Sequence, residues 1–270
     1  MSAVSWGAGD FGGGLLTRRA PLFGVVFLSQ AVGMAFALAF AIGRGETLPL
    51  PVDVVWSILA GVAGGIGITA LYQGLAVGRM GIVAPVTGVI AALIPVSAGI
   101  VTEGVPAPVV LAGIGLAIVA VMLVSRAPRD GTGPSGLRFA LVAGVAIGSL
   151  SVLLAQVSDG HAFGPLSVMR VTEAVLIGGF ILVTRATWRP EGRLVPAIGA
   201  VGVLDMLGNG AFIIAVQAGA LAVAAVLSSL YPVTTVILAT VVLHEKVTRD
   251  HAAGIGLAGV AIACIAAGST

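Results

Sequence analysis

Long stretches without a charged residue set the strongest limit on how this chain of 270 residues folds. Twenty-four uncharged residues separate Arg19 from Arg44, and further stretches of 20 or more follow along the chain. Each can cross the hydrocarbon core of a bilayer, which takes about 20 residues of helix. Only 9% of the residues are charged and 58% are hydrophobic, too few charges to cover a water-facing surface. We therefore expect a polytopic membrane protein.

The uncharged stretches, together with two spans that contain charges, predict an all-α protein with ten transmembrane helices. The charged spans are 165–184, with Arg170 and Glu173, and 195–217, with Asp205. The first segment, 1–16, is short and contains five glycines. It lacks the basic region and the cleavage site of a signal peptide. It is either a short helix buried against its neighbours or the end of a longer segment that starts upstream.

The sequence repeats itself after about half its length. The run GIGLA starts at Gly113 and again at Gly254, each time after an apolar stretch that closes on a glutamate, Glu103 or Glu245. A repeat of this period predicts two copies of one structural unit. We also expect each glutamate to cap the helix that follows it, because the N-terminal end of a helix favours a carboxylate.

The two units are expected to hold five helices each, 1–126 and 138–270, joined by a cytoplasmic linker over 127–137 that is rich in proline, glycine and charge. An odd number of helices inverts the second unit relative to the first, which suits alternating access. The odd-numbered loops carry 11 of the 13 Lys and Arg residues. By the positive-inside rule these loops are cytoplasmic and both termini external, in a multi-pass protein of the cytoplasmic (inner) membrane.

Four segments carry a family resemblance: Trp6-Gly7, Leu71-Tyr72, the run SSLYPVTTVILATVVLHEKV from Ser228 to Val247, and GIGLAG from Gly254. With Pro232 thirteen residues before Glu245, the chain resembles the EamA-like members of the drug/metabolite transporter superfamily. Thr102-Glu103-Gly104 departs from the Gly-Glu-Arg pattern that is usual there. The resemblance implies a transporter of a small metabolite. It also implies that helices 1, 3, 4, 6, 8 and 9 surround a cavity and that helices 5 and 10 brace the outside.

Charges inside the predicted helices are the main candidates for function, because a charge at mid-membrane costs roughly 2.5–3.5 kcal/mol and needs a partner, water or a role. Asp205 is either a proton-coupling carboxylate, a partner for a cationic substrate, or half of a structural ion pair with Arg170. Arg170 and Glu173 lie one turn apart and form either a self-neutralising pair, or a gate or an anion site. Asp10 faces inward if its segment spans the membrane and is solvated if that segment frays.

Uncharged polar residues supply further candidate contacts to a substrate. Asn209 follows Asp205 by four residues, so the two share one helix face and form the expected cavity wall. The other candidates are Trp6, Gln30, Tyr72, Gln73, Gln156, Gln217 and Tyr231. The alternative for all of them is hydrogen bonding between helices. Three prolines predict kinks that are either hinges beside the pathway or static bends: Pro85, Pro95 and Pro232.

The expected function is a secondary transporter, most simply an exporter, with Asp205 and then Asp10 and Glu173 as candidates for proton coupling. The alternative is a flippase for a lipid-linked intermediate, which a laterally open apolar groove would favour. The expected partners are a small-molecule substrate and membrane lipid. The sequence has no nucleotide-binding motif, no histidine cluster and one cysteine, so no metal, cofactor, nucleic acid or enzymatic activity is expected.

Overall fold

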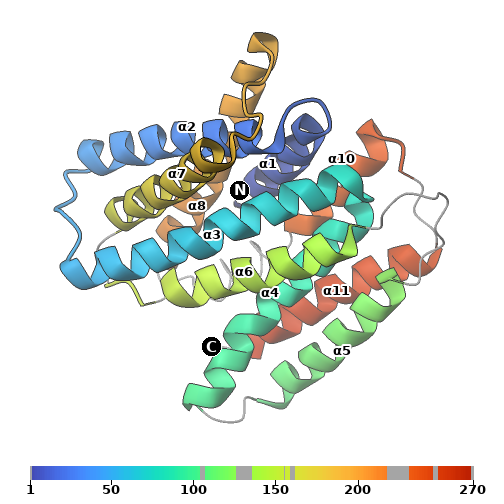
Figure 1. Ribbon diagram of the computed structural model, residues 1–270. Coiled ribbons are helices and arrows are strands. Elements are labelled where there is room, and N and C mark those ends of the chain that lie inside the picture. Colours follow the sequence, from blue (N-terminus) through green and yellow to red (C-terminus); the bar gives the residue numbers. More distant parts are fainter. Residues whose placement is uncertain are drawn as a thin grey trace.

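The computed structural model of the protein describes residues 2–103, 107–125, 136–154, 156–158, 162–217, 231–245 and 249–268, which fold into helices without a strand among them (Figure 1). The prediction of an all-helical chain is confirmed. The helices are α1 Ser2–Thr17, α2 Leu22–Gly43, α3 Pro51–Val77, α4 Met80–Glu103, α5 Pro108–Ser125, α6 Leu137–Leu154, α7 Phe163–Thr184, the short 3₁₀ helix η1 Gly192–Leu194, α8 Val195–Gln217, α10 Tyr231–Val242 and α11 Arg249–Gly268.

Five stretches of helix are long and apolar enough to cross a membrane: Leu22–Gly43, Pro51–Val77, Leu137–Leu154, Phe163–Thr184 and Gly192–Ala211. Four further apolar helical segments are shorter within the described residues. Large apolar side chains cover the outside of the bundle, and Leu182 and Val183 are 80% and 85% exposed. A water-soluble monomer rarely exposes an apolar surface of this extent, so the outer face suits lipid.

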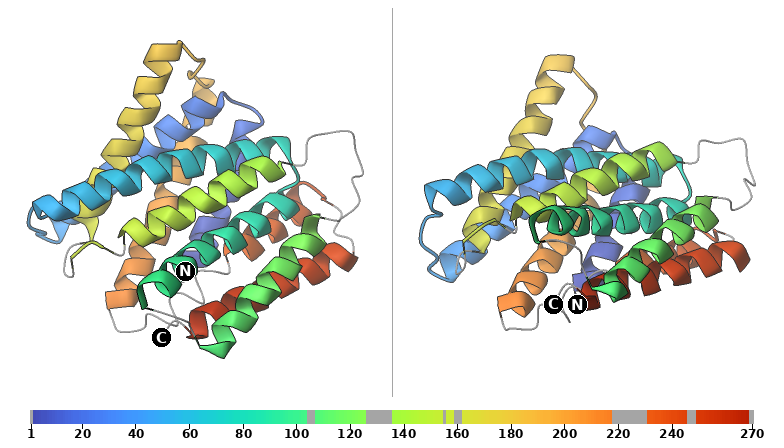
Figure 2. Two further views of the ribbon diagram at one scale, coloured as in Figure 1. Left: turned by 60° about the horizontal axis from the view of Figure 1, so that its bottom comes forward. Right: turned by 90° about the horizontal axis from the view of Figure 1, so that it is seen from below.

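Helices from the two halves of the chain pack against one another throughout the bundle. α2 lies against α7, and α5 lies against α11 along one edge of the molecule (Figures 1 and 2). The contact of α3 with α6 has its counterpart in that of α1 with α8, and α4 with α6 has its counterpart in α1 with α10. If α1 to α5 are exchanged in order with α6, α7, α8, α10 and α11, the main contacts between helices are therefore reproduced.

Glycines allow the closest of these approaches. A Cβ atom added to Gly144 of α6 would lie 2.5 Å from the Cβ of Ile90 in α4. At Gly61 of α3 it would lie 2.7 Å from the carbonyl oxygen of Met169 in α7. Small residues at such crossings are the usual means by which membrane helices approach closely.

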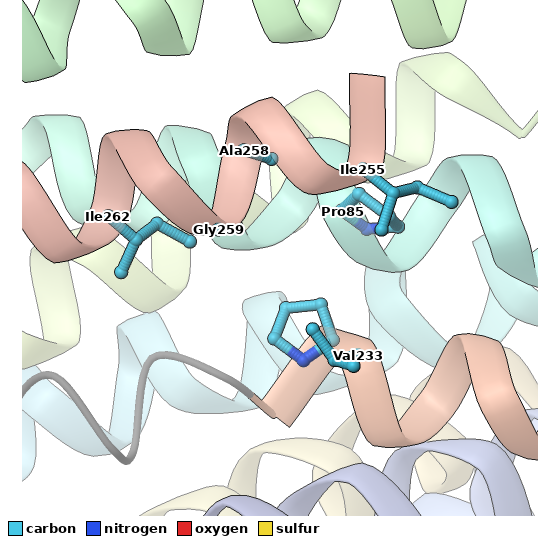
Figure 3. A pocket seen from close by; sticks show the side chains of 7 residues that line it. Pro85, Val233, Ile255, Ala258, Gly259 and Ile262 are labelled. Carbon is cyan, nitrogen blue, oxygen red and sulfur yellow. The ribbon is translucent and has the colours of Figure 1, made fainter. Parts of the chain in front are cut away.

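Two of the three candidate hinge prolines border a small apolar pocket between α4, α10 and α11. Pro85 lies inside α4, and Pro232 is the second residue of α10. Figure 3 shows Pro85 beside Ile255 of α11, with Val233 of α10 across from them. Pro95 is also in α4, but its side chain lies outside the described residues. The pocket lining is entirely apolar, so in a membrane it suits hydrocarbon.

Glu245, just beyond α10, caps the start of α4. Its carboxylate accepts hydrogen bonds from the backbone N–H groups of Met80 and Gly81, both 3.1 Å long, at the start of α4. Residues 246–248, which lead into α11, lie outside the described residues, so a cap of Glu245 on that helix stays a prediction. Tertiary packing brings the α4 N-terminus to Glu245, and the unpaired N–H groups of any helix start attract a carboxylate. The side chain of Glu103 lies outside the described residues.

A second carboxylate does the same at the other end of the bundle. Oε2 of Glu46, between α2 and α3, accepts hydrogen bonds from the N–H groups of Phe163 and Gly164 at the start of α7, both 2.9 Å long. We call the contacts of Glu245 and Glu46 the α4 clasp and the α7 clasp. They lie beyond opposite ends of α3, whose 27 residues span about 40 Å. Each clasp joins one half of the chain to the other.

Candidate functional site

Arg170 of α7 is the centre of a buried polar network between the two clasps. Its Nη1 donates to Oε2 of Glu173 at 2.8 Å and also to Oε1 of Gln30 in α2. Its Nη2 donates to Oδ2 of Asp205 in α8. Arg170 is 4% exposed and Glu173 is 1% exposed. The structure therefore contains both the self-neutralising pair within α7 and the ion pair to Asp205 that the sequence left as alternatives.

Asp10 adds a third carboxyl group from α1. Its segment forms a helix, and the residue is 9% exposed near the middle of it. Asp10 lies close enough to Asp205 for their charges to repel each other. The backbones of α1 and α8 are in contact here, because a Cβ atom at Gly9 would lie an ordinary 3.8 Å from the backbone nitrogen of Asp205. Among the described residues no hydrogen bond or ion pair reaches the Asp10 carboxyl group.

Tyr72 of α3 closes the network from a further side. It is 2% exposed, and its ring lies over Gly13 of α1, where a Cβ atom would be 2.2 Å from Cζ. It interacts electrostatically with Asp205, Asp10 and Arg170. Five helices, α1, α2, α3, α7 and α8, thus contribute polar groups to the network.

A glycine in α3 fixes the position of the Glu173 carboxylate. A Cβ atom at Gly64 would lie 2.2 Å from Oε1 of Glu173, so any larger residue would displace the carboxylate. One residue on, a Cβ atom at Gly65 would meet Cγ of Glu173 at an ordinary 3.8 Å. This contact was not among the candidates from the sequence, although the spacing of Gly61 and Gly65 already indicates a close helix crossing.

The network carries an excess of negative charge. Among the described residues it holds three carboxyl groups, on Asp10, Glu173 and Asp205, and one guanidinium group, on Arg170. Asp10 and Asp205 stand near the middle of their helices, which is the depth at which a membrane charge is most costly. The excess therefore has to be balanced by protons or by a bound cation.

Aromatic residues lie next to the carboxylates. Trp6 is one turn before Asp10 on α1, and its ring covers Gly208 of α8, where a Cβ atom would be 2.4 Å from Cδ1. Trp6 and Tyr231 meet edge to face, with 6.3 Å between ring centroids. The Tyr231 hydroxyl is buried, and the described residues offer it no hydrogen-bond partner. Asn209, half-buried on α8, lies one turn beyond Asp205.

Two of the candidates lie apart from this network. Gln156 is exposed just beyond the end of α6, where its Nε2 donates to the carbonyl oxygen of Val152 at 3.4 Å. Gln73 is half-buried on α3 and, as the residue after Tyr72, points about 100° away around the helix. Within the part of the chain that the structure describes, no group of three or more His, Cys, Asp or Glu residues is arranged to hold a metal ion.

Comparisons with known proteins bear on both halves of the chain. Residues 134–267 match the sequence model of the EamA-like transporter family. A solved structure described as "Crystal structure of protein" is similar over 97% of this chain and 96% of its own, with a TM-score of 0.64 and 19% sequence identity. At that identity the similarity concerns the fold. No curated protein sequence matches the chain significantly.

Proposed function

The second half of the chain belongs to the EamA-like transporter family, and from this premise we propose that the protein is a secondary transporter that exports a small metabolite by alternating access. The family is one of membrane transporters of small substrates, and the apolar outer surface of the bundle agrees with it. The proposed location is the cytoplasmic membrane, with the Arg-rich α3–α4 end inside and both termini outside.

The proposed architecture is ten spans in two inverted units of five, 1–126 and 138–270, with the linker 127–137 between them. Most of the linker lies outside the described residues. The paired contacts support this arrangement, because α3 with α6 matches α1 with α8 under exchange of the two units. Inverted repeats around a midplane site are typical of transporters in which one unit rocks against the other.

The observation that carries the proposal is the position of the buried network between two clasps. The network lies at mid-helix depth, while the α4 clasp and the α7 clasp close the bundle beyond opposite ends of α3. A carrier needs one closure on each side of its site, opened in turn.

Coupling is proposed to run through the carboxyl groups of the network. Asp205 is the first candidate, because it is paired to Arg170 on another helix and is partly exposed, with 22% of its side chain accessible. Asp10 and Glu173 follow. A proton on Asp205 would weaken its attraction to Arg170, which would link proton binding to the contact between α7 and α8.

The test is the accessibility of the site from each side of the membrane. Cys264 is the only cysteine, so Cys264→Ser gives a background into which Asn209→Cys places one thiol in the site. We expect a membrane-impermeant methanethiosulfonate reagent to label this thiol from either side of sealed vesicles. Glu245→Gln should speed labelling from the α4-clasp side only. Labelling from neither side would refute alternating access, and Glu191→Gln, in an exposed ion pair, is the matched control.

A laterally open apolar groove was expected to favour the flippase alternative, but the lining of the groove in this structure does not support a lipid-linked substrate. An open apolar groove runs between α10 and α11, and its lining consists of Val, Ile, Ala and Gly residues, among them Val236 and Ala263. A lipid-linked intermediate carries a polar head group, and this lining has no polar side chain to bind one. The groove suits acyl chains of the surrounding bilayer.

A further inference from the structure

We propose that the transported substrate is an organic cation whose ammonium group binds between Asp10 and Asp205. The apolar part of the substrate would contact Trp6 and Tyr231. This inference rests on the proposed transport function and assigns its chemical class of substrate. Four observations lead to it.

The first observation is that the net charge of the site is negative. The network holds three carboxyl groups and one guanidinium group, and only Asp205 among these residues is partly exposed. An anionic substrate such as a phosphate ester would add to the excess negative charge, whereas a cation would offset it. The charge therefore favours cations and disfavours anions.

The second observation is that Asp10 is buried without a partner among the described residues. The two terminal nitrogens of Arg170 donate hydrogen bonds to Gln30, Glu173 and Asp205, and neither nitrogen donates to Asp10. A buried carboxyl group without a donor is costly, and a ligand can supply the donor. Asp10 and Asp205 come from helices that pack directly on each other, so one ammonium group can contact both.

The third observation is the pair of aromatic rings on the same side. Trp6 precedes Asp10 by one turn, and the ring of Tyr231 lies edge to face with Trp6 and within electrostatic reach of Asp10. Indole and phenol faces attract ammonium groups, and a carboxylate beside them strengthens the attraction. The buried Tyr231 hydroxyl adds a hydrogen-bonding group that the described residues leave unused.

The fourth observation is that the site already contains a cation of its own. The guanidinium of Arg170 pairs with the carboxylate of Asp205. An incoming ammonium group would compete for the same carboxylate, and Arg170 would keep its bonds to Glu173 and Gln30. Substrate binding would thereby release the connection between α7 and α8, which gives the ligand different contacts in the two states, as a conformational change requires.

The probe for this inference is benzyltrimethylammonium, whose charge does not depend on pH. Its binding to the purified protein would be measured by isothermal titration calorimetry and compared with neutral benzyl alcohol and anionic benzenesulfonate. We expect the cation to bind at least tenfold more tightly than either. Asp10→Asn should weaken its binding at least tenfold, and Glu191→Gln should leave it unchanged. If Asp10→Asn does not purify as a folded protein, Trp6→Leu replaces it with the same expectation.

Two outcomes would overturn the inference: binding of benzenesulfonate as tight as that of the cation, or unchanged binding of the cation in the Asp10 variant. Absence of cation binding to the unmodified protein at millimolar concentration would also overturn it. Labelling of Asn209→Cys from both sides of sealed vesicles would then leave the transport function standing. Failure of that labelling would instead refute the transport function.

Discussion

Glu245 and Met80 are joined by a hydrogen bond across 165 positions of the sequence, from the backbone N–H of Met80 to the carboxylate. The bond places the end of α10 against the start of α4. Arg18, just beyond the end of α1, lies 3.8 Å from the same carboxylate and also donates to the carbonyl oxygens of Leu75 and Gly78. Three separate segments of the bundle thus converge on one glutamate.

Glu245→Ala should lower the free energy of unfolding by about 1–2 kcal/mol, because two N–H groups of α4 lose their acceptor. Glu245→Gln should cost less, since the amide oxygen still accepts. Thermal or denaturant unfolding in detergent measures both. Glu191→Ala removes an exposed ion pair to Arg193 and should change stability by less than about 0.5 kcal/mol. Equal losses at positions 245 and 191 would contradict the role of the α4 clasp.

Arg170→Met should be among the most destabilising single substitutions, at about 3–5 kcal/mol, because it leaves Glu173 and Asp205 without their counter-charge. Adding Glu173→Gln and Asp205→Asn to it should recover most of the loss. Denaturant unfolding of the single, double and triple variants gives the coupling between the sites. Strictly additive losses would mean that the network is not one unit.

Gly64→Ala should destabilise the protein by about 1–3 kcal/mol and impair transport, because the added methyl group occupies the position of the Glu173 carboxylate. The neighbouring Gly65→Ala is the matched control, since its added Cβ atom meets only ordinary contacts. It should be neutral or slightly stabilising, as Ala favours a helix over Gly. Similar effects at the two positions would contradict the tight contact at Gly64.

Asp205→Asn should abolish the pH dependence of transport in proteoliposomes while preserving the fold, because it keeps the shape of the side chain and removes the carboxyl group proposed to carry the proton. The charged or titratable groups that face Asp205 are Arg170 and Glu173 on α7, Asp10 on α1 and Tyr72 on α3. Asp10→Asn serves as the comparison. A pH dependence that survives Asp205→Asn and disappears in Asp10→Asn would move the coupling role to Asp10.

Composition and charge spacing predicted the helices well, because a bilayer admits few alternatives to a helix. Each of the ten predicted spans overlaps a described helix. The short first segment also forms a helix, α1. Asp10, Arg170, Glu173 and Asp205 were found for the same reason: a charge in an apolar span stands out. Gln73 and Gln156 were chosen by polarity alone, and polarity does not say which way a side chain faces.

The partners of these residues were beyond the reach of the sequence. Nothing in the local sequence indicates that Glu245 meets Met80, because that contact depends on how the two halves pack. The same holds for Gly64. In the sequence it is one of 40 glycines, and only its packing against Glu173 of α7 distinguishes it. Contacts between distant segments are set by tertiary packing, and one sequence alone carries little information about them.

The α4 clasp also has a consequence for synthesis of the chain. Met80 and Gly81 leave the ribosome long before Glu245 does, and at 5–20 residues per second the delay is roughly ten to thirty seconds. During that time the first N–H groups of α4 have no carboxylate to which they can donate hydrogen bonds. The α7 clasp runs the other way, with Glu46 made well before Phe163. The first half therefore lacks this cap until the second half has been synthesised. A chain truncated before Glu245 would enter the membrane with the start of α4 uncapped.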